Sequence, residues 1–206
     1  LCIVDAVPSG STENTRFDQN ASLEGVAKWY GYIDQPERVP EFMRRAFTML
    51  RSGRPGPVVL GIPNASATYD ETQDPYISPK GWRSLPDPVD VKIAADALNS
   101  SNNPLLFVGE GVLYSDATEE LKAFAEKANL PVVTTLKAKG AFPENHPLSV
   151  GVRGDHVLKY MNDADLIFAV GASISPGRFG HGIPDATNKK IIQCNIDEYD
   201  INRMYP

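Results

Sequence analysis

The sequence predicts an α/β fold built on a doubly wound parallel sheet, and two observations predict it. After Pro88, expected strands and helices alternate along the chain, as they do where right-handed crossovers join parallel strands. The run Val58-Val59-Leu60-Gly61-Ile62 is apolar on both faces, which is typical of a strand inside a parallel sheet covered by helices. We therefore expect a parallel sheet of about five or six strands after residue 88.

The region before residue 63 contains two expected strands separated by a helix. Residues 1–7 open with an apolar run and are expected to form a buried strand, followed by a polar loop over residues 8–14. A helix is expected from Val39, because apolar residues recur at helical spacing as far as Leu50. Gly53 can end this helix in the left-handed conformation, and a tight turn then leads into the strand over residues 58–62.

The region after residue 63 divides into an expected linker and a series of alternating elements. Prolines and small polar residues replace any periodicity over residues 63–88, which predicts an extended linker. Asp116 and Glu119 are spaced as a capping box at the start of one expected helix, and Val89, Ile93, Ala94 and Ala97 share one face of another. Helices are expected over residues 89–98, 115–128 and 156–161, and strands over residues 105–108, 131–135, 166–170 and 190–196.

Composition narrows the classes of function. Lys and Arg total 20 and Asp and Glu total 26, so the formal net charge is −6, which argues against a nucleic-acid partner. Apolar runs stay far below the roughly 18 residues that a membrane span needs. Cys2 and Cys194 fit neither a disulfide framework nor a metal spacing, and free thiols suit a reducing, cytoplasmic compartment. The chain opens inside an apolar run without Met or a signal peptide, so we expect a piece of a longer protein.

The carboxyl ends of the expected strands carry the candidate binding residues. Ligands of open α/β sheets lie beyond this edge, and each strand here is followed by small or polar residues. The glycines beside Glu110 allow close approach of a ligand or form a plain tight turn, and Ser115 is expected to open a helix whose dipole favours an anion. Asp197 suits either a ribose hydroxyl or a helix N-cap. The candidate residues are Gly109, Glu110, Gly111, Thr135, Leu136, Gly171, Ser173, Asn195 and Asp197.

Familiar catalytic sets are missing from the sequence. The third glycine of a dinucleotide fingerprint is replaced by Tyr114, and neither a P-loop nor a G-x-S-x-G elbow occurs. His146, His156 and His181 are isolated, so surface or capping roles are expected for them. The residues by themselves predict a nucleotide-binding type of fold without visible catalytic machinery.

One segment and several shorter motifs occur in a familiar order. The segment from Ser52 to Pro63 reads S-G-R-P-G-P-V-V-L-G-I-P. The shorter motifs are R-F-D at 16–18, A-K-W-Y at 27–30, G-E-G at 109–111 with Ser115, T-T-L-K-A-K-G-A-F-P at 134–143, G-V-R-G at 151–154 and N-I-D at 195–197. Together they resemble thiamine-diphosphate-dependent enzymes of the acetolactate synthase and pyruvate decarboxylase type, along almost the whole chain.

This resemblance implies a domain layout and a set of cofactors. It makes residues 1–70 the C-terminal part of the pyrimidine-binding domain, residues 71–88 a linker and residues 89–206 a Rossmann-like central domain. Thiamine diphosphate and magnesium would be bound outside this chain, which lacks the catalytic glutamate and the G-D-G…N motif. FAD or ADP would lie in the central domain, with Gly151 and Gly154 added to the candidate residues and Arg54 reaching its phosphates. Lys28 would lie on the substrate side.

The resemblance also has departures. The flavin-contacting G-x-R-F-D-D-R of acetolactate synthases is replaced here by the sequence from Gly171 to Arg178. Position 18 is Asp rather than Gln, and position 110 is Glu rather than Gly, which places a carboxylate where a diphosphate would lie. These changes weaken the FAD interpretation and the strict acetolactate synthase interpretation.

Three hypotheses about function follow. The first is a fragment of a thiamine-diphosphate-dependent 2-keto acid lyase or ligase, a transferase or decarboxylase that is inactive as this fragment alone. Its partners would be the remaining domains of the same chain, a second copy in a homodimer or homotetramer, and a small-molecule substrate. The second is a non-catalytic adenine-nucleotide-binding or regulatory module. A lone NAD-type dehydrogenase domain is the third, and the missing glycine argues against it.

Overall fold

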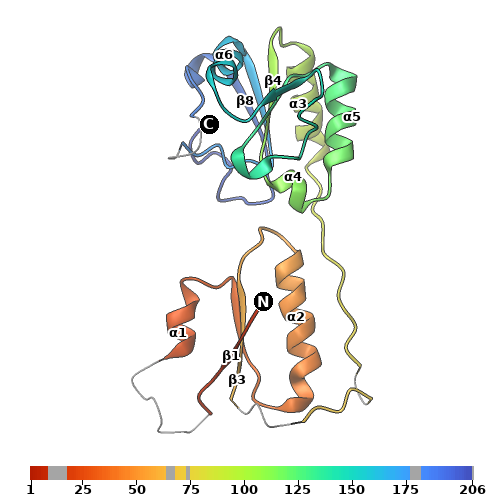
Figure 1. Ribbon diagram of the computed structural model, residues 1–206, viewed down its shortest axis with the longest axis vertical. Helices are drawn as coiled ribbons and strands as arrows, with labels where there is room; N and C mark the ends of the chain where they lie inside the picture. The colour runs from red at the N-terminus through yellow and green to blue at the C-terminus, as the bar shows by residue number, and fades with distance from the viewer. Residues whose placement is uncertain (9–17, 64–67, 73–74, 177–181, 206) are drawn as a thin grey trace. The chain divides into compact units, whose positions relative to one another are not determined.

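The computed structural model describes residues 1–8, 18–63, 68–72, 75–176 and 182–205. The chain divides into two compact units, Leu1–Ser84 and Leu85–Pro206, shown in Figure 1. The division falls inside the expected linker of residues 71–88. Most of the polar loop at residues 8–14, the first two residues of the R-F-D motif, Arg178 and His181 lie outside the described residues.

The first unit is built on a three-stranded parallel sheet in the order β1-β3-β2. Val58 and Leu60 of the central strand are fully buried and pack with Ile33 and with Ala46 of α2. The expected helix from Val39 and strand over 58–62 are confirmed, whereas α1 and β2 were not predicted from the sequence. The elements are β1 Cys2–Asp5, α1 Gln19–Glu24, β2 Trp29–Tyr32, the 3₁₀ turn η1 Pro36–Arg38, α2 Val39–Arg51 and β3 Val58–Ile62.

The prediction that the first strand is buried is wrong. Residues of β1 are mostly exposed, and Ile3 has an exposed fraction of 59%. The reason is position: β1 pairs only with β3, so it is an edge strand, and α2 packs against β2 and β3 instead. An apolar run predicts a strand, but only the strand order decides how far it is buried.

Part of the expected linker packs against the first unit. The Arg51 guanidinium donates hydrogen bonds to the Ser78 hydroxyl at 2.8 Å and to the Pro79 carbonyl at 2.7 Å. The Trp82 amide donates to the Ser52 hydroxyl at 3.2 Å. Residues up to Ser84 therefore belong to the same compact unit as the first sheet, and the linker over residues 71–88 stays a prediction.

The second unit contains a five-stranded sheet in the order β6-β5-β4-β7-β8, with every pair parallel. The chain moves from β4 outward to β6, then returns to the other side of β4 for β7 and β8. This reversal between β4 and β7 is the switch point of a doubly wound fold. The strands are β4 Pro104–Val108, β5 Val132–Thr134, β6 Ser149–Gly151, β7 Leu166–Val170 and β8 Lys190–Cys194.

Helices cover both faces of this sheet (Figure 1). Leu105 and Phe107 of β4 pack with residues of α6, while Leu106 and Val108 pack with residues of α4 and α5. A strand buried on both faces explains the continuous apolar run of β4. The helices are α3 Pro88–Asn99, α4 Gly111–Tyr114, α5 Thr118–Ala128 and α6 Asp155–Asp163. In the described parts of the chain, none of the helices is long and apolar enough to cross a membrane.

Two expectations about these helices are wrong. The helix expected over residues 115–128 begins only at Thr118, as α5, because Asp116 adopts a φ of 53°, which lies outside the α-helical region. Asp116 therefore cannot be the expected cap, although Leu121 and Ala125 are buried as predicted. The apolar face of α3 is largely exposed: the exposed fraction is 65% for Val89 and 61% for Ile93. Among the described residues, no residue of α3 belongs to either core cluster of the second unit.

Candidate functional site

The carboxyl ends of the five parallel strands meet at one edge of the second sheet. Val108 of β4 lies opposite Thr134 of β5 and opposite Val170 of β7, and Val170 in turn lies opposite Cys194 of β8. The loops that follow these strands therefore start at the same level. We call this border, with the residues that follow each strand, the carboxyl edge.

The glycines at the switch point pack against each other. The Gly109 amide donates to the Val170 carbonyl at 2.9 Å, and the Gly111 amide donates to the Gly171 carbonyl at 3.0 Å. A Cβ atom on Gly109 would lie only 2.1 Å from the Gly171 carbonyl oxygen. Gly171 itself has a φ of 60°, which favours glycine. These glycines are explained by contact between two loops, which supports the tight-turn interpretation over close approach of a ligand.

Glu110 lies between these glycines and is paired. Its Oε1 atom lies 3.2 Å from the Nζ atom of Lys137, in the 3₁₀ turn η2 Leu136–Ala138 that follows β5. Exposed fractions of these side chains are 37% for Glu110 and 76% for Lys137. The expected helix opening at Ser115 is wrong, because Ser115 is the C-cap of the four-residue helix α4.

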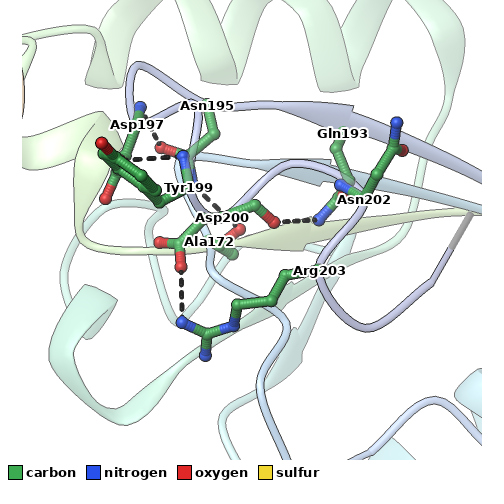
Figure 2. A network of polar contacts seen from close by, with 8 residues as sticks. All are labelled: Ala172, Gln193, Asn195, Asp197, Tyr199, Asp200, Asn202 and Arg203. Atoms are coloured by element: carbon green, nitrogen blue, oxygen red, sulfur yellow. Dashed lines mark hydrogen bonds and ion pairs between the residues drawn. The ribbon is translucent and has the colours of Figure 1, made fainter.

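The loop after β8 is held by its own polar side chains, as Figure 2 shows. The Asn195 side chain donates to the Ala172 carbonyl at 3.3 Å and accepts from the Asp197 amide at 3.1 Å. Asp197 is 9% exposed, and its carboxylate accepts from the Tyr199 amide at 3.1 Å. Arg203 pairs with the buried Asp200 at 3.2 Å. Asp197 therefore caps a turn, which supports the capping interpretation over contact with a ribose.

The loop after β5 presents groups that remain accessible. The Thr135 amide donates to the Val108 carbonyl at 2.8 Å, which fixes the start of the loop to β4. Leu136 has an exposed fraction of 51%. Gly140 has a φ of 91°, and a Cβ atom there would meet nothing within 4 Å. Backbone at Gly140 is thus open to a ligand in a way that the switch-point glycines are not.

The remaining candidates after β6 and β7 have mainly local roles. Gly151 and Gly154 adopt φ values of 99° and 126°, and a Cβ atom on Gly154 would lie 2.9 Å from the His156 ring. Gly154 therefore makes room for His156 at the start of α6, whereas Gly151 is explained by its positive φ alone. Ser173 is half-buried and precedes Ile174, a buried residue with a φ of 49°, which is an unusual conformation for a β-branched side chain.

Lys28 and Arg54 belong to the first unit. The Lys28 ammonium donates to the carbonyls of Met49, Ser52 and Arg54 at 2.6, 2.6 and 2.9 Å, so it caps the C-terminal end of α2. Burial lowers the pKa of Lys28. This cap uses all three donors of the ammonium, and a substrate-side role for Lys28 stays a prediction. The reach of Arg54 to a nucleotide also stays a prediction.

Several exposed apolar side chains occur in the segments that follow the strands at the carboxyl edge. They follow β4, β5 and β8, and a ligand with an aromatic group would cover such surface. Lys137 adds a cation to this edge, and Gly140 adds an open stretch of backbone. Lys137 was not selected from the sequence, because a lone lysine in a loop carries no signal. The apolar residues are Leu113, Tyr114, Leu136, Ile196 and Tyr199.

The described residues contain no metal-binding cluster, and His146 has a structural role. The described residues contain no group of three or more His, Cys, Asp or Glu side chains that could hold a metal ion. His146 accepts the Leu148 amide at 3.2 Å and lies 3.0 Å from a Glu126 carboxylate oxygen, which fits the expected capping role. Cys2 and Cys194 are free.

Strand order, crossover helices and loops at one edge define the second unit as a Rossmann-like α/β domain. Residues 91–206 match the family model described as the thiamine pyrophosphate enzyme central domain. The chain therefore belongs to the family of thiamine-pyrophosphate-dependent enzymes, as the motifs predicted.

Curated relatives and a solved structure agree with this assignment. The chain is 34% identical to the acetolactate synthase large subunit of Corynebacterium glutamicum, over 99% of the chain and 34% of the relative. It is 30% identical to the acetolactate synthase isozyme 1 large subunit of Escherichia coli, over 99% of the chain and 38% of the relative. A putative thiamin diphosphate-dependent enzyme from Mycobacterium smegmatis has a TM-score of 0.61 at 27% identity, over 81% of this chain and 33% of that one. The chain thus spans about a third of the length of these proteins.

Proposed function

We propose that this chain is part of a thiamine-diphosphate-dependent lyase or ligase that acts on 2-keto acids, as the resemblance to acetolactate synthases implies. The observation that carries the proposal is the match of residues 91–206 to the family's central domain. When bound, thiamine diphosphate supplies an electron sink for cleavage or formation of a C–C bond. The chain itself supplies the central scaffold and an adenine-nucleotide site at the carboxyl edge.

Chemistry of the carboxyl edge supports ADP or FAD as the nucleotide. Lys137 would hold a phosphate oxygen, the open backbone at Gly140 would approach the phosphates, and apolar residues such as Leu136 and Tyr199 would cover an aromatic ring. The glycines at the switch point would shape the loops without touching the ligand. Because Asp197 is occupied as a turn cap, the site does not depend on it.

A calorimetric titration of the purified chain with ADP and with FAD tests the nucleotide site. We expect heat of binding with a one-to-one stoichiometry for at least one of the two. Adenosine is the control, because it has the ring without the phosphates and should bind more weakly. Absence of binding for both nucleotides would overturn the site.

Sequencing the gene on both sides of the region that encodes this chain tests the enzyme. A glutamate upstream in the family's pyrimidine-domain context and a G-D-G…N motif downstream are expected. An open reading frame without either one would contradict the enzyme and favour the second candidate, a nucleotide-binding regulatory module. The nucleotide titration distinguishes that module from an empty scaffold.

A further inference from the structure

An ion pair joins two loops of the carboxyl edge. Glu110 follows β4 and Lys137 follows β5, and Oε1 and Nζ lie 3.2 Å apart. Both ends are exposed to solvent, with Lys137 the more exposed at 76%. A negatively charged ligand at this edge would therefore meet Lys137 while it is paired with Glu110.

The backbone holds Glu110 in this position. Hydrogen bonds of its two neighbours, from the Gly109 amide to Val170 and from the Gly111 amide to Gly171, attach the segment around Glu110 to the end of β7 and the residue after it. On the other side, the amide of Thr135 is bonded to Val108, and the Ala138 amide to Thr135. A ligand can displace the Glu110 side chain from Lys137, but the carboxylate stays within a side-chain length of the site.

We propose that Glu110 acts as a built-in competitor of phosphate groups for Lys137. The inference rests on the proposed adenine-nucleotide site and adds a rule for its selectivity. A phosphate oxygen that binds Lys137 must break the ion pair and then lie beside a like charge. The site therefore discriminates against highly charged nucleotides, and its preference moves toward ligands with fewer phosphate charges.

The small energy of an exposed ion pair indicates that Glu110 weakens phosphate binding without preventing it. An exposed ion pair contributes little, so phosphates carrying two or three negative charges displace a single carboxylate. Repulsion from the displaced carboxylate then weakens binding in proportion to ligand charge, and salt reduces it. The neutral ligand adenosine is insensitive to the pair.

Titrations of matched variants test the proposal. We expect Glu110→Gln to tighten ADP binding about fivefold at low salt, with a larger effect for ATP and none for adenosine. Lys137→Met should weaken ADP binding and reduce the gain from Glu110→Gln when the two are combined. Asp96→Asn is the control: it changes the net charge equally, in an exposed pair with Lys92 at 2.6 Å on α3. It should leave ADP binding unchanged.

The outcomes separate the inference from the proposed function. If Glu110→Gln binds ADP with the affinity of the wild-type chain while Lys137→Met binds it more weakly, the competitor role of Glu110 is wrong and the nucleotide site stands. If Lys137→Met also keeps the wild-type affinity, Lys137 does not hold the phosphates, and both the placement of the nucleotide and the inference are wrong. If Asp96→Asn has the same effect as Glu110→Gln, the cause is net charge and the inference also fails. If no variant binds any adenine nucleotide, the site itself is wrong, and the inference falls with it. Circular dichroism of each variant checks that the fold is retained.

Discussion

Lys28 is the side chain that connects the start of β2 to the end of α2. Its ammonium bonds to the carbonyls of Met49 in the last turn of α2, of Ser52 at the C-cap and of Arg54 just after the helix. Its backbone amide donates to the Pro57 carbonyl at 2.7 Å. Gly56 lies against its stem, where a Cβ atom would be 3.0 Å from the Lys28 Cβ atom. The R-P-G-P motif at residues 54–57 therefore helps to position the Lys28 side chain.

Replacing Lys28 with Met should expose the end of α2. Loss of a charged cap costs about 1 kcal/mol, because the carbonyls return to water and the helix dipole loses its counter-charge. Hydrogen exchange of the peptide that covers residues 45–54, followed by mass spectrometry, should become faster. Lys122→Met is the control, since its ammonium lies 4.0 Å from Glu126 on α5 and caps no helix. Unchanged exchange in the Lys28 variant would contradict the capping role.

Asp165 performs a similar task in the second unit, at the opposite edge of the sheet. Its carboxylate accepts from the Ser101 hydroxyl and from the amides of Asn102 at 2.7 Å and Asn103 at 3.0 Å. Burial opposes the charged form, but these hydrogen bonds outweigh it and lower the pKa of Asp165 below its ordinary value of 3.8. The carboxylate therefore joins the loop before β4 to the start of β7.

Stability should depend on pH through Asp165. A carboxyl whose pKa is lowered by folding contributes stability above its unfolded pKa, and the contribution is lost as pH falls through the folded pKa. Asp165→Asn should therefore lower the free energy of unfolding by about 1–2 kcal/mol at pH 7, and the difference should shrink below about pH 4. Urea unfolding of both proteins between pH 3 and pH 7 measures this. A difference that is constant with pH would show that the charge is irrelevant.

At the scale of elements, the loops after β4 and β7 are held together at the switch point. The loop after β4 and the loop after β7 meet backbone to backbone through Gly109, Gly111 and Gly171. Because β4 and β7 are adjacent and parallel, any side chain at the contact would separate the loops. Order in one loop therefore supports order in the other, and with it the position of Glu110.

Substituting Gly109 by Ala should disrupt this contact. A methyl group 2.1 Å from the Gly171 oxygen forces the loops apart, and overpacking of this kind costs about 1–3 kcal/mol. The midpoint of thermal unfolding should fall, and nucleotide binding should weaken with it. Gly25→Ala is the matched control, because a Cβ atom there meets nothing within 4 Å and φ is −79°. Equal midpoints for the two variants would contradict the loop contact.

At the scale of the whole molecule, the chain spans about a third of the length of its relatives. No described cluster of side chains could hold a metal ion. The resemblance implies that thiamine diphosphate and magnesium are bound outside this chain, so we expect the purified chain to show no turnover of a 2-keto acid even when both are added. Carbon dioxide release from pyruvate measures this, with a relative's complete acetolactate synthase as the positive control. Decarboxylation by the chain alone would refute the prediction.

Local signals in the sequence predicted the class of fold and the family. Apolar periodicity placed α2 and the strands β3, β4 and β7, because spacing along one segment determines which face is apolar. It failed where a single residue broke the pattern, as Asp116 does between α4 and α5. It also missed β6, which is only three residues long. The motifs, read in order, predicted the thiamine-pyrophosphate-dependent family that the comparison with the family model supports.

Contacts between distant segments were decided only by the tertiary structure. The pair of Glu110 and Lys137 joins loops 27 residues apart, and the glycine contact joins β4 to β7 across the insertion of β5 and β6. The apolar periodicity of a sequence does not indicate such pairs, because they depend on strand order and on which strands end side by side. The sequence by itself therefore determined most of the longer elements, the parallel class and the family. The tertiary structure determined which glycines serve packing, which lysine caps a helix and which lysine pairs with Glu110.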